Sequence, residues 1–413
     1  MFSEKSRVIV QNAEEKRVEQ FKLIEQVAFS NQAKVLKAFR NNRVSERHFA
    51  GTTGYGCGDE GRDTLRKVFA DVFGAEDAII SPHISCATHA LSMSLYGILR
   101  PNDLMLSITG KPYDTLDQVI FGNKNNKDTG SLKDFNVKFE QVNLKNNLPD
   151  IEVITEKLRA LHPKLVFMQR SRGYSWRRAL TIDQIGELVK LIRKESPNSF
   201  IMTDNCYGEF TETREPTNVG VDIAVGSLIK NAGGGLAPAG AYVVGSKRAI
   251  DLIAARFTTP SVMQAVGSYE AGYRMFYQGL FVAPHVVGQI LKGSSLIRTT
   301  MHSVGYEVSP APEEISGDIV SLIKFDTAEK LIAFCQAIQS ASPVDSYVTP
   351  MPWDMPGYSD QVIMAGGSFI QGATIELSCD SPIRAPYIAY LQGGLTYEHI
   401  KIATMMCLDS ISK

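Results

Sequence analysis

Short apolar runs and segments with helical periodicity alternate through the middle of the chain. Apolar runs bounded by polar or turn-forming residues are typical of buried strands, and they occur at residues 78–81, 104–108, 137–142, 165–168, 200–203, 223–225 and 241–244. Most of the segments between them have apolar residues at helical spacing, at 88–99, 115–121, 151–161 and 182–194. This alternation predicts an α/β fold with a mostly parallel seven-stranded sheet, covered by helices on both faces.

The pattern changes on either side of this region. Helical spacing runs from about residue 14 to 39, with Asn12 as a candidate N-cap, and a glycine-dense loop surrounds Tyr55. After Pro260 the chain is largely helical to about residue 304, interrupted near Pro284. A strand at 319–325, a helix at 328–340, strands at 362–364 and 373–378, and a last helix follow.

The length of 413 residues exceeds what one hydrophobic core usually serves. We therefore expect an N-terminal helical segment at 1–48, a large α/β domain at 49–260 and a smaller C-terminal α+β domain at 261–413. Five glycines around Tyr55 indicate that the backbone of this loop lies against a ligand or a partner chain, with a plain connecting loop as the alternative.

Composition excludes several classes of function. A net charge of −1 with 21% charged residues gives no reason to expect a nucleic acid or membrane partner. No apolar run approaches the roughly 20 residues that span a bilayer, and the N-terminus resembles a charged helix more than a signal peptide. The six cysteines form no CxxC pair and the seven histidines no HExxH motif, so neither disulfides nor a metal site are expected. These features predict a cytoplasmic protein.

Lys230 is the first candidate for chemistry. It lies in the sequence Ser227-Leu-Ile-Lys230-Asn-Ala-Gly-Gly-Gly, directly after an apolar strand. Glycines next to a lysine leave room for a planar ring near the backbone, and a lysine in such a pocket loses its proton more easily and can form a Schiff base with an aldehyde. The alternative is a solvated lysine in a flexible loop.

Two more strand ends carry polar residues that suit a cofactor. Asp204 follows a buried strand, where a carboxylate needs a cationic partner such as a protonated pyridinium nitrogen. A helix cap or a metal ligand is the alternative. Tyr113 follows another strand and could stack on a flat ring, although a core or surface tyrosine is an equal alternative.

The segment Cys86-Ala87-Thr88 opens a helix, and free N–H groups at a helix N-terminus bind phosphate. The hydroxyl of Ser227 could bind the same phosphate. An aspartate and a later Ser-x-x-Lys motif, each at a strand end, combine with this helix start to predict pyridoxal phosphate as cofactor.

These motifs resemble the fold-type-I pyridoxal phosphate enzymes, the aspartate aminotransferase superfamily. Longer segments are similar to a bacterial family named for methionine γ-lyase or cystathionine β-lyase similarity and for aluminium resistance. They are HFAGTTGYG at 48–56, QRSRGYSW at 169–176, GLFVAPH at 279–285 and PIRAPY at 382–387.

The resemblance implies a role for each cofactor residue. Lys230 would form the Schiff base and later act as acid and base, Asp204 would hold the ring nitrogen, and Tyr113 would stack on the ring. The phosphate would be held by Ser227 and by the backbone of Cys86, Ala87 and Thr88.

The resemblance also implies how substrate and subunits meet. Arg384 is the first candidate for binding the substrate carboxylate, with Arg170 and Arg172 as competitors. Tyr55 would reach the active site of a neighbouring subunit, which implies a homodimer or homotetramer.

The sequence departs from the related enzymes at two places. Gly56 and Cys57 stand where an arginine usually follows the loop tyrosine, and Arg62 comes later. Cys86-Ala87 replaces a Ser-Gly pair, so the alanine Cβ would keep the phosphate slightly further from the backbone.

The resemblance predicts a carbon–sulfur lyase that acts on a sulfur-containing amino acid by β- or γ-elimination, releasing ammonia and a 2-oxo acid. An aminotransferase or aldolase would use the same cofactor residues. A cofactor-binding protein of stress or aluminium resistance, with little turnover, is a third alternative. No carboxylate cluster for a trivalent cation stands out in the sequence.

Overall fold

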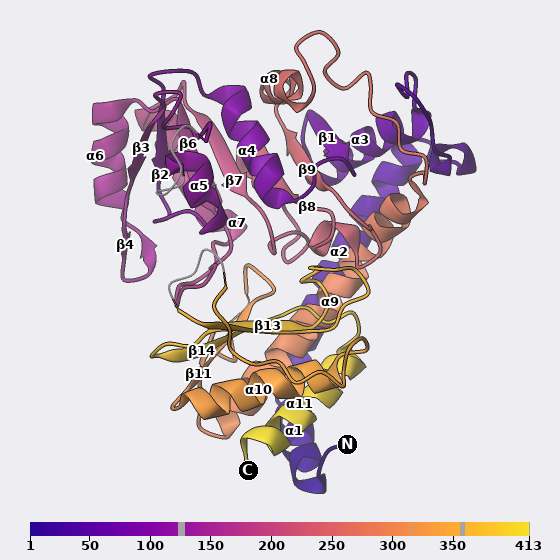
Figure 1. Cartoon of the computed structure of the whole chain (residues 1–413), viewed down its shortest axis with the longest axis vertical. Helices are drawn as coiled ribbons and strands as arrows, with labels where there is room; N and C mark the ends of the chain where they lie inside the picture. The colour runs from indigo at the N-terminus through magenta and orange to yellow at the C-terminus, as the bar shows by residue number, and fades with distance from the viewer. Residues whose placement is uncertain (123–128, 315, 356–359, 413) are drawn as a thin grey trace.

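Two β-sheets lie one above the other along the long axis of the molecule, and both chain termini lie at the end that carries the smaller sheet (Figure 1). The computed structural model describes residues 1–122, 129–314, 316–355 and 360–412. The larger sheet has seven strands in the order β1-β9-β8-β7-β6-β2-β3, and the smaller has five in the order β10-β11-β14-β13-β12.

The seven-stranded sheet is mixed. Its central strands run parallel, whereas β9 is antiparallel to both of its neighbours, β1 and β8. Its strands are β1 (Asp77–Ser81), β2 (Leu104–Ser107), β3 (Lys138–Gln141), β6 (Leu165–Gln169), β7 (Phe200–Asp204), β8 (Ile223–Ser227) and β9 (Ala241–Gly245). A separate hairpin pairs β4 (Leu144–Lys145) with β5 (Leu148–Pro149).

Both faces of this sheet are buried because its side chains alternate between two cores. Leu165 and Phe167 of β6 pack with helices α4, α5 and α8, whereas Val166 and Met168 pack with α6 and α7. The helices are α3 (Glu60–Phe73), α4 (Ala87–Ile98), α5 (Thr115–Phe121), α6 (Ile151–Leu161), α7 (Ile182–Glu195) and α8 (Lys247–Phe257).

The five-stranded sheet is antiparallel throughout, and helices α10 and α11 pack together at its face. Its elements are β10 (Glu307–Ser309), β11 (Ser321–Phe325), α10 (Ala328–Ala341), β12 (Val362–Ala365), β13 (Ser378–Pro382), β14 (Tyr387–Gln392) and α11 (Tyr397–Ile411). Helix α1 (Glu4–Glu15) packs on α11.

Helix α9 (Arg274–Ser303) connects the two halves and packs along α2 (Val18–Asn41) (Figure 1). It touches the turn after Lys230 near one end and β11 and α11 toward the other. Among the described residues, α9 is the helix that is long and apolar enough to cross a membrane, but 72% of its most apolar 18-residue stretch is buried inside the molecule. A buried core helix has this composition as well.

The seven predicted strands and four interleaved helices of the large sheet are confirmed. Three expectations about other elements are wrong. The N-terminal helix is two helices, with Ser3 rather than Asn12 as the first N-cap. Helix α9 continues through Pro284, since its packing in the core compensates for the hydrogen bond that proline removes.

The third error concerns the C-terminal strands. Residues 373–377 form turns in which Ile375 and Leu377 are buried, and the strand begins only at Ser378. Apolar alternation over that segment therefore reflected burial rather than a strand. Strands β10 and β14 were not predicted.

Candidate active site

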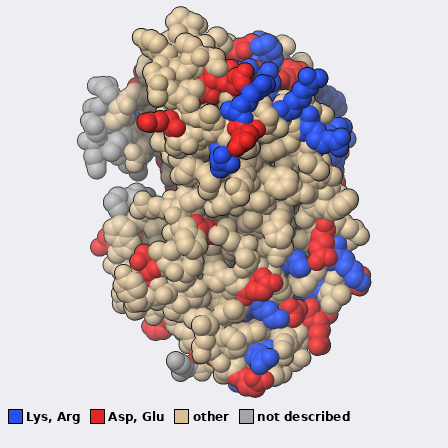
Figure 2. Space-filling model, turned by 90° about the vertical axis from the view of Figure 1, so that its right-hand side faces the viewer, with Lys and Arg blue, Asp and Glu red and all other residues tan. Residues whose placement is uncertain are grey.

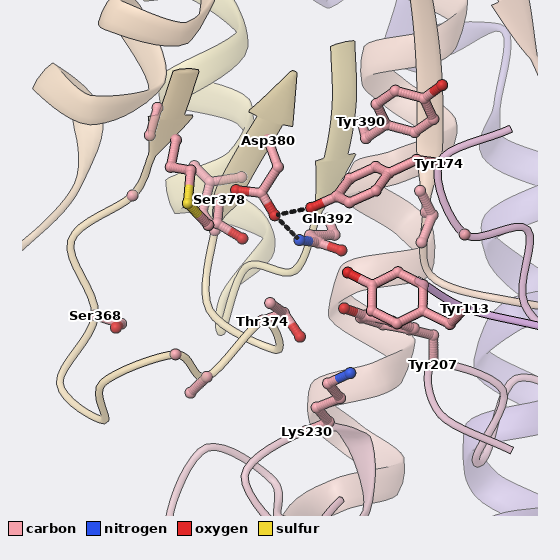
Figure 3. Close-up of a pocket in the computed structure, with 18 of the residues that line it drawn as sticks. Tyr113, Tyr174, Tyr207, Lys230, Ser368, Thr374, Ser378, Asp380, Tyr390 and Gln392 are labelled. Atoms are coloured by element: carbon pink, nitrogen blue, oxygen red, sulfur yellow. Dashed lines mark hydrogen bonds between the residues drawn. The ribbon is translucent and has the colours of Figure 1, made fainter. Parts of the chain in front are cut away.

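A cavity of about 470 Å³ lies between the strand ends of the large sheet and the five-stranded sheet (Figure 3). Its aromatic lining consists of Tyr113, Tyr174, Tyr207 and Tyr390. Neutral polar side chains are contributed by Thr115, Ser368, Thr374, Ser378 and Gln392. Among the described lining residues, the charged ones are Lys230 and Asp380.

Lys230 enters this cavity from the turn that follows β8. Its Nζ lies 4.0 Å from the centroid of the Tyr207 ring. Burial alone would lower the pKa of Lys230, but attraction to the groups of Tyr207, Cys206 and Asp204 outweighs this effect, and the pKa is raised. The expectation that this lysine loses its proton easily is therefore wrong for the protein without a ring in the cavity.

The glycines after Lys230 also serve a different purpose from the one predicted. A Cβ on Gly233 would lie 1.6 Å from the carbonyl oxygen of Leu228, and one on Gly234 would lie 2.3 Å from the carbonyl oxygen of Gly279 in α9. The glycines thus let the turn pack against its own strand end and against the long helix. They fix the position of Lys230 rather than clear space for a ring.

Asp204 and Ser227 end two neighbouring parallel strands, β7 and β8. The Oδ1 atom of Asp204 accepts a hydrogen bond from the backbone N–H of Cys206 at 3.1 Å. Burial raises the pKa of Asp204, while the positive charge of Lys230 opposes the increase. The Ser227 hydroxyl accepts a bond from the backbone N–H of Ile229 at 3.3 Å and keeps its own proton for another acceptor.

The N-terminal residues of α4, Cys86, Ala87 and Thr88, are not part of the described cavity lining but lie next to its residue Thr115. Cys86 caps this helix through its thiol, which accepts from the His89 N–H at 3.4 Å. The hydroxyl of Thr88 lies 2.8 Å from that of Thr115, a lining residue. Within the described part of the chain, the amides of Ala87 and Thr88 donate no hydrogen bond, as is usual for the first turn of a helix. Two donors are thus available to an anion.

Tyr113 follows β2 and contributes one aromatic wall. Its ring centroid lies 5.9 Å from that of Tyr174, and both side chains face the cavity (Figure 3). Tyr207 lies beside Lys230, and the Tyr390 ring packs edge-on against Tyr174 with a centroid distance of 5.1 Å. Of these four tyrosines, only Tyr113 was predicted from the sequence as a site residue.

Asp380 was also not identified in advance. It lies on β13, and its Oδ2 atom accepts hydrogen bonds from the Tyr174 hydroxyl and the Gln392 side-chain amide, both at 3.2 Å (Figure 3). Burial raises the pKa of Asp380 to about 6, although both hydrogen bonds and the charge of Lys230 oppose the increase. The sequence held little signal for it, since small, mostly polar residues flank Asp380 along β13 and its cross-strand partner, Tyr390, lies on β14, which was not predicted.

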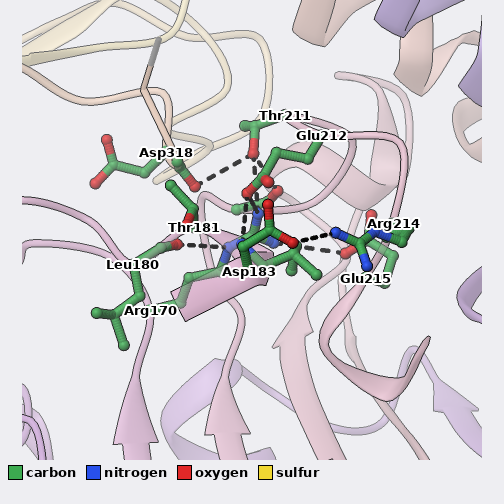
Figure 4. A network of polar contacts seen from close by, with 12 residues as sticks. Arg170, Leu180, Thr181, Asp183, Thr211, Glu212, Arg214, Glu215 and Asp318 are labelled. Carbon is green, nitrogen blue, oxygen red and sulfur yellow. Dashed lines mark hydrogen bonds and ion pairs between the residues drawn. The ribbon is translucent and has the colours of Figure 1, made fainter. Parts of the chain in front are cut away.

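Arg170 does not line this cavity, contrary to its candidacy as a substrate-binding residue. Its guanidinium is fully buried and donates to Asn205 at 2.9 Å and to Glu212 at 2.9 Å, and it pairs with Glu215 at 3.6 Å (Figure 4). All its charge is thus compensated inside the protein. Arg172 is committed in the same way, to the buried Asp318 at 3.2 Å.

Arg384 and Tyr55 lie outside the described lining of the cavity. Arg384 follows β13 and forms an exposed ion pair with Asp360 at 3.0 Å. It is close enough to Tyr390 for its charge to oppose the rise in the pKa of that tyrosine that burial causes. Tyr55 is 81% exposed, in a loop whose backbone bonds to Gly267.

The residues that converge here fit pyridoxal phosphate. Lys230 supplies an amine for the aldehyde, the buried carboxylate of Asp204 suits the protonated ring nitrogen, and Tyr113 provides an aromatic face. The free amides at the start of α4 suit the phosphate. No group of three or more potential metal-ligating residues occurs in the described ranges.

Comparison with known proteins agrees with this fit. The family model described as methionine gamma-lyase matches residues 6–412. YnbB of Bacillus subtilis (strain 168), an uncharacterized protein, is 45% identical over 393 residues, which cover 94% of this chain and 92% of YnbB. The solved structure of a carbon-sulfur lyase involved in aluminum resistance from Clostridium novyi NT has a TM-score of 0.94 at 46% identity, covering 98% of this chain and 96% of that chain.

A more distant likeness concerns the fold alone. The pyridoxal-5'-phosphate dependent protein YhfS from Escherichia coli has a TM-score of 0.62 at 14% identity, covering 94% of this chain and 97% of that chain. The family match confirms the resemblance predicted from the sequence, and it implies pyridoxal phosphate as cofactor. The chain belongs to the methionine gamma-lyase family and has the fold of the fold-type-I pyridoxal phosphate enzymes.

Proposed function

We propose that this protein is a pyridoxal phosphate-dependent carbon–sulfur lyase that removes a thiol from a sulfur-containing amino acid by β- or γ-elimination. The observation that carries the proposal is that Lys230 and Tyr113 line one cavity, with the buried Asp204 close to Lys230 and the α4 N-terminus next to the lining residue Thr115. The carbon–sulfur lyase named above, which shares this fold at 46% identity, supports the reaction class.

Within this proposal each residue has a defined task. Lys230 would hold the cofactor through its aldehyde, and Asp204 would keep the ring nitrogen protonated. The cofactor, when bound, supplies an electron sink for the negative charge that develops at the substrate Cα. Once the substrate amine has displaced Lys230, its Nζ is free to take the proton from Cα.

The substrate would approach from the side of the five-stranded sheet. Tyr174, Tyr390 and Met364 line that side of the cavity and would exclude water from the reacting bonds. Arg384 would bind the substrate carboxylate after it exchanges Asp360 for the ligand. Loss of the thiol and hydrolysis of the remaining enamine give ammonia and a 2-oxo acid.

A second copy of the chain would complete the site. The face of the molecule in Figure 2 has a wide uncharged area in its centre, while charged residues gather toward its margins. Helices α2 and α9 carry exposed apolar side chains, Phe29 at 77% and Phe281 at 41% exposure. Such surface is usually covered by a partner, and the exposed Tyr55 would then reach into the partner's cavity.

The test is an absorption spectrum of the purified protein with added pyridoxal phosphate. We expect a visible band from the bound cofactor that changes on adding L-cystathionine, L-methionine or L-cysteine, with 2-oxo acid appearing in step. Lys230→Ala should lose both the band and the product, whereas Lys247→Ala, an exposed lysine paired with Asp251, should retain both.

Other results have clear meanings. Transfer of the amino group without release of ammonia would indicate an aminotransferase, and release of an aldehyde would indicate an aldolase. A normal band with no product from any thioether amino acid would favour a cofactor-binding protein with little turnover. A full band in Lys230→Ala would refute the assignment of the lysine.

A further inference from the structure

The two charged residues of the described cavity lining lie on opposite sides of it. Lys230 belongs to the turn after β8 in the large sheet, and Asp380 belongs to β13 in the small sheet (Figure 3). The part of a bound substrate that extends from Lys230 toward the five-stranded sheet therefore approaches a carboxylate. Through the described lining, no arginine or second lysine offsets this charge.

One oxygen of the Asp380 carboxylate is available to accept further hydrogen bonds. Both of its hydrogen bonds fall on Oδ2, from Tyr174 and Gln392. Within the described residues, Oδ1 accepts no hydrogen bond. The nearby hydroxyl oxygen of Ser378, two residues earlier on the same strand and also in the lining, is buried and has no hydrogen-bond partner in the structure. This end of the cavity is thus rich in unused acceptors.

Unused acceptors around a buried carboxylate favour a cationic donor. Burying an ionised carboxylate with neutral hydrogen-bond partners alone is unfavourable, and the donors that contact Asp380 are a hydroxyl and an amide, while the charge of Lys230 acts on it only from across the cavity. An ammonium group carries three donors and a positive charge, and so can serve Oδ1 and the Ser378 hydroxyl together. A carboxylate in this place would be repelled.

We propose that Asp380 is a specificity-determining residue, which selects thioether amino acids whose leaving thiol carries an ammonium group. This inference rests on the proposed lyase function and narrows its substrate class. In the β-elimination of such a substrate the bond between Cβ and sulfur breaks, and the electron pair leaves with sulfur, which gains a proton. The overall reaction consumes one water and gives an aminothiol, ammonium and pyruvate.

Three cysteine thioethers test the proposal on the cofactor-loaded protein. S-(2-aminoethyl)-L-cysteine carries the ammonium, S-propyl-L-cysteine is its neutral isostere, and S-carboxymethyl-L-cysteine is anionic. A charge-assisted hydrogen bond corresponds to a preference of roughly 10- to 100-fold, so kcat/KM should favour the cation over the isostere by that factor. The anion should be the poorest substrate. Calorimetric titration of each compound should rank the dissociation constants in the same order.

Asp380→Asn should remove the preference, because it keeps the size of the side chain and loses its charge. The expected change is a higher KM for the cationic compound and a KM for the neutral isostere within about threefold of wild type. Asp326→Asn, which removes an exposed carboxylate outside the described cavity lining, should leave the ranking unchanged.

Each outcome decides a separate question. Equal use of the cationic and neutral compounds by the wild type, or a preference that persists in Asp380→Asn, would overturn the role of Asp380 and leave the lyase function intact. Absence of 2-oxo acid from every thioether would overturn the lyase function. The calorimetric ranking would still test Asp380 in that case, since binding alone reports the preference.

Discussion

Replacing Asp380 with asparagine should make the protein more stable at neutral pH. The pKa of this carboxyl rises from 3.8 to about 6 on folding, mainly because it is buried. A difference of about two units between the folded and unfolded chains corresponds to about 3 kcal/mol. Asparagine has nearly the same shape, still accepts a hydrogen bond from Tyr174 or Gln392, and carries no charge.

The sign of the effect depends on pH. The folded protein holds the Asp380 proton more tightly than the unfolded chain does, so the carboxyl imposes no cost below about pH 4. As pH rises to about 6 and beyond, ionisation costs the folded state progressively more, up to about 3 kcal/mol. Asp380→Asn should therefore match the wild type near pH 4 and exceed it above pH 6. Lys230, Tyr207 and Tyr390 line the same cavity, and because their pKa values are raised they keep their protons over this range.

Denaturant unfolding of the cofactor-free protein between about pH 4 and pH 8 measures the difference. Asp326→Asn is the matched control with the opposite sign, because the hydrogen bond from Lys330 holds the pKa of Asp326 below its usual value. That variant should gain nothing at neutral pH. Equal stability of Asp380→Asn and wild type at pH 8, or a difference that does not change with pH, would refute the reasoning.

Two further predictions concern the arginine network and the assembly. Arg170→Met should lower the free energy of unfolding by about 3–5 kcal/mol, because it leaves Glu215 buried without its cation. The KM measured for the folded variant should equal that of the wild type, and a raised KM would indicate that Arg170 binds substrate after all. Mixing Tyr55→Phe with Lys230→Ala chains should restore part of the activity through hybrid sites, measured as 2-oxo acid release, whereas isolated heterodimers without activity would argue against a shared site.

The large sheet could be predicted from the sequence because its strands are buried on both faces. Each strand is a short apolar run, and a helix of clear periodicity separates most of them. The residues that we propose to hold the cofactor were found in the sequence for a related reason. Asp204 and Ser227 are polar residues at the ends of apolar strands, and such strand ends meet at one edge of a parallel sheet.

The side of the cavity formed by the five-stranded sheet could not be predicted in the same way. Tyr174 and Asp380 are 206 residues apart, and only the packing of one sheet over the other brings them within 3.2 Å. The arginines were misjudged for a physical reason as well. A guanidinium after a buried strand can bind a ligand or a buried glutamate, and the partner of Arg170 is 45 residues away in Glu215.

The continuity of α9 restricts how the cavity can open. This helix has 30 residues and is about 45 Å long. It packs against the glycine turn next to Lys230 and also against β11, so it connects the two sheets rigidly. A hinge motion between the two sheets would have to bend α9, most easily at Pro284, where one backbone hydrogen bond is missing. We therefore expect substrate to enter by movement of the segment 366–372, which borders the cavity with Gly366, Ser368 and Gly372, while the distance between Lys230 and Asp380 stays nearly constant. The constant distance between Lys230 and Asp380 would then determine which length of substrate side chain fits between them.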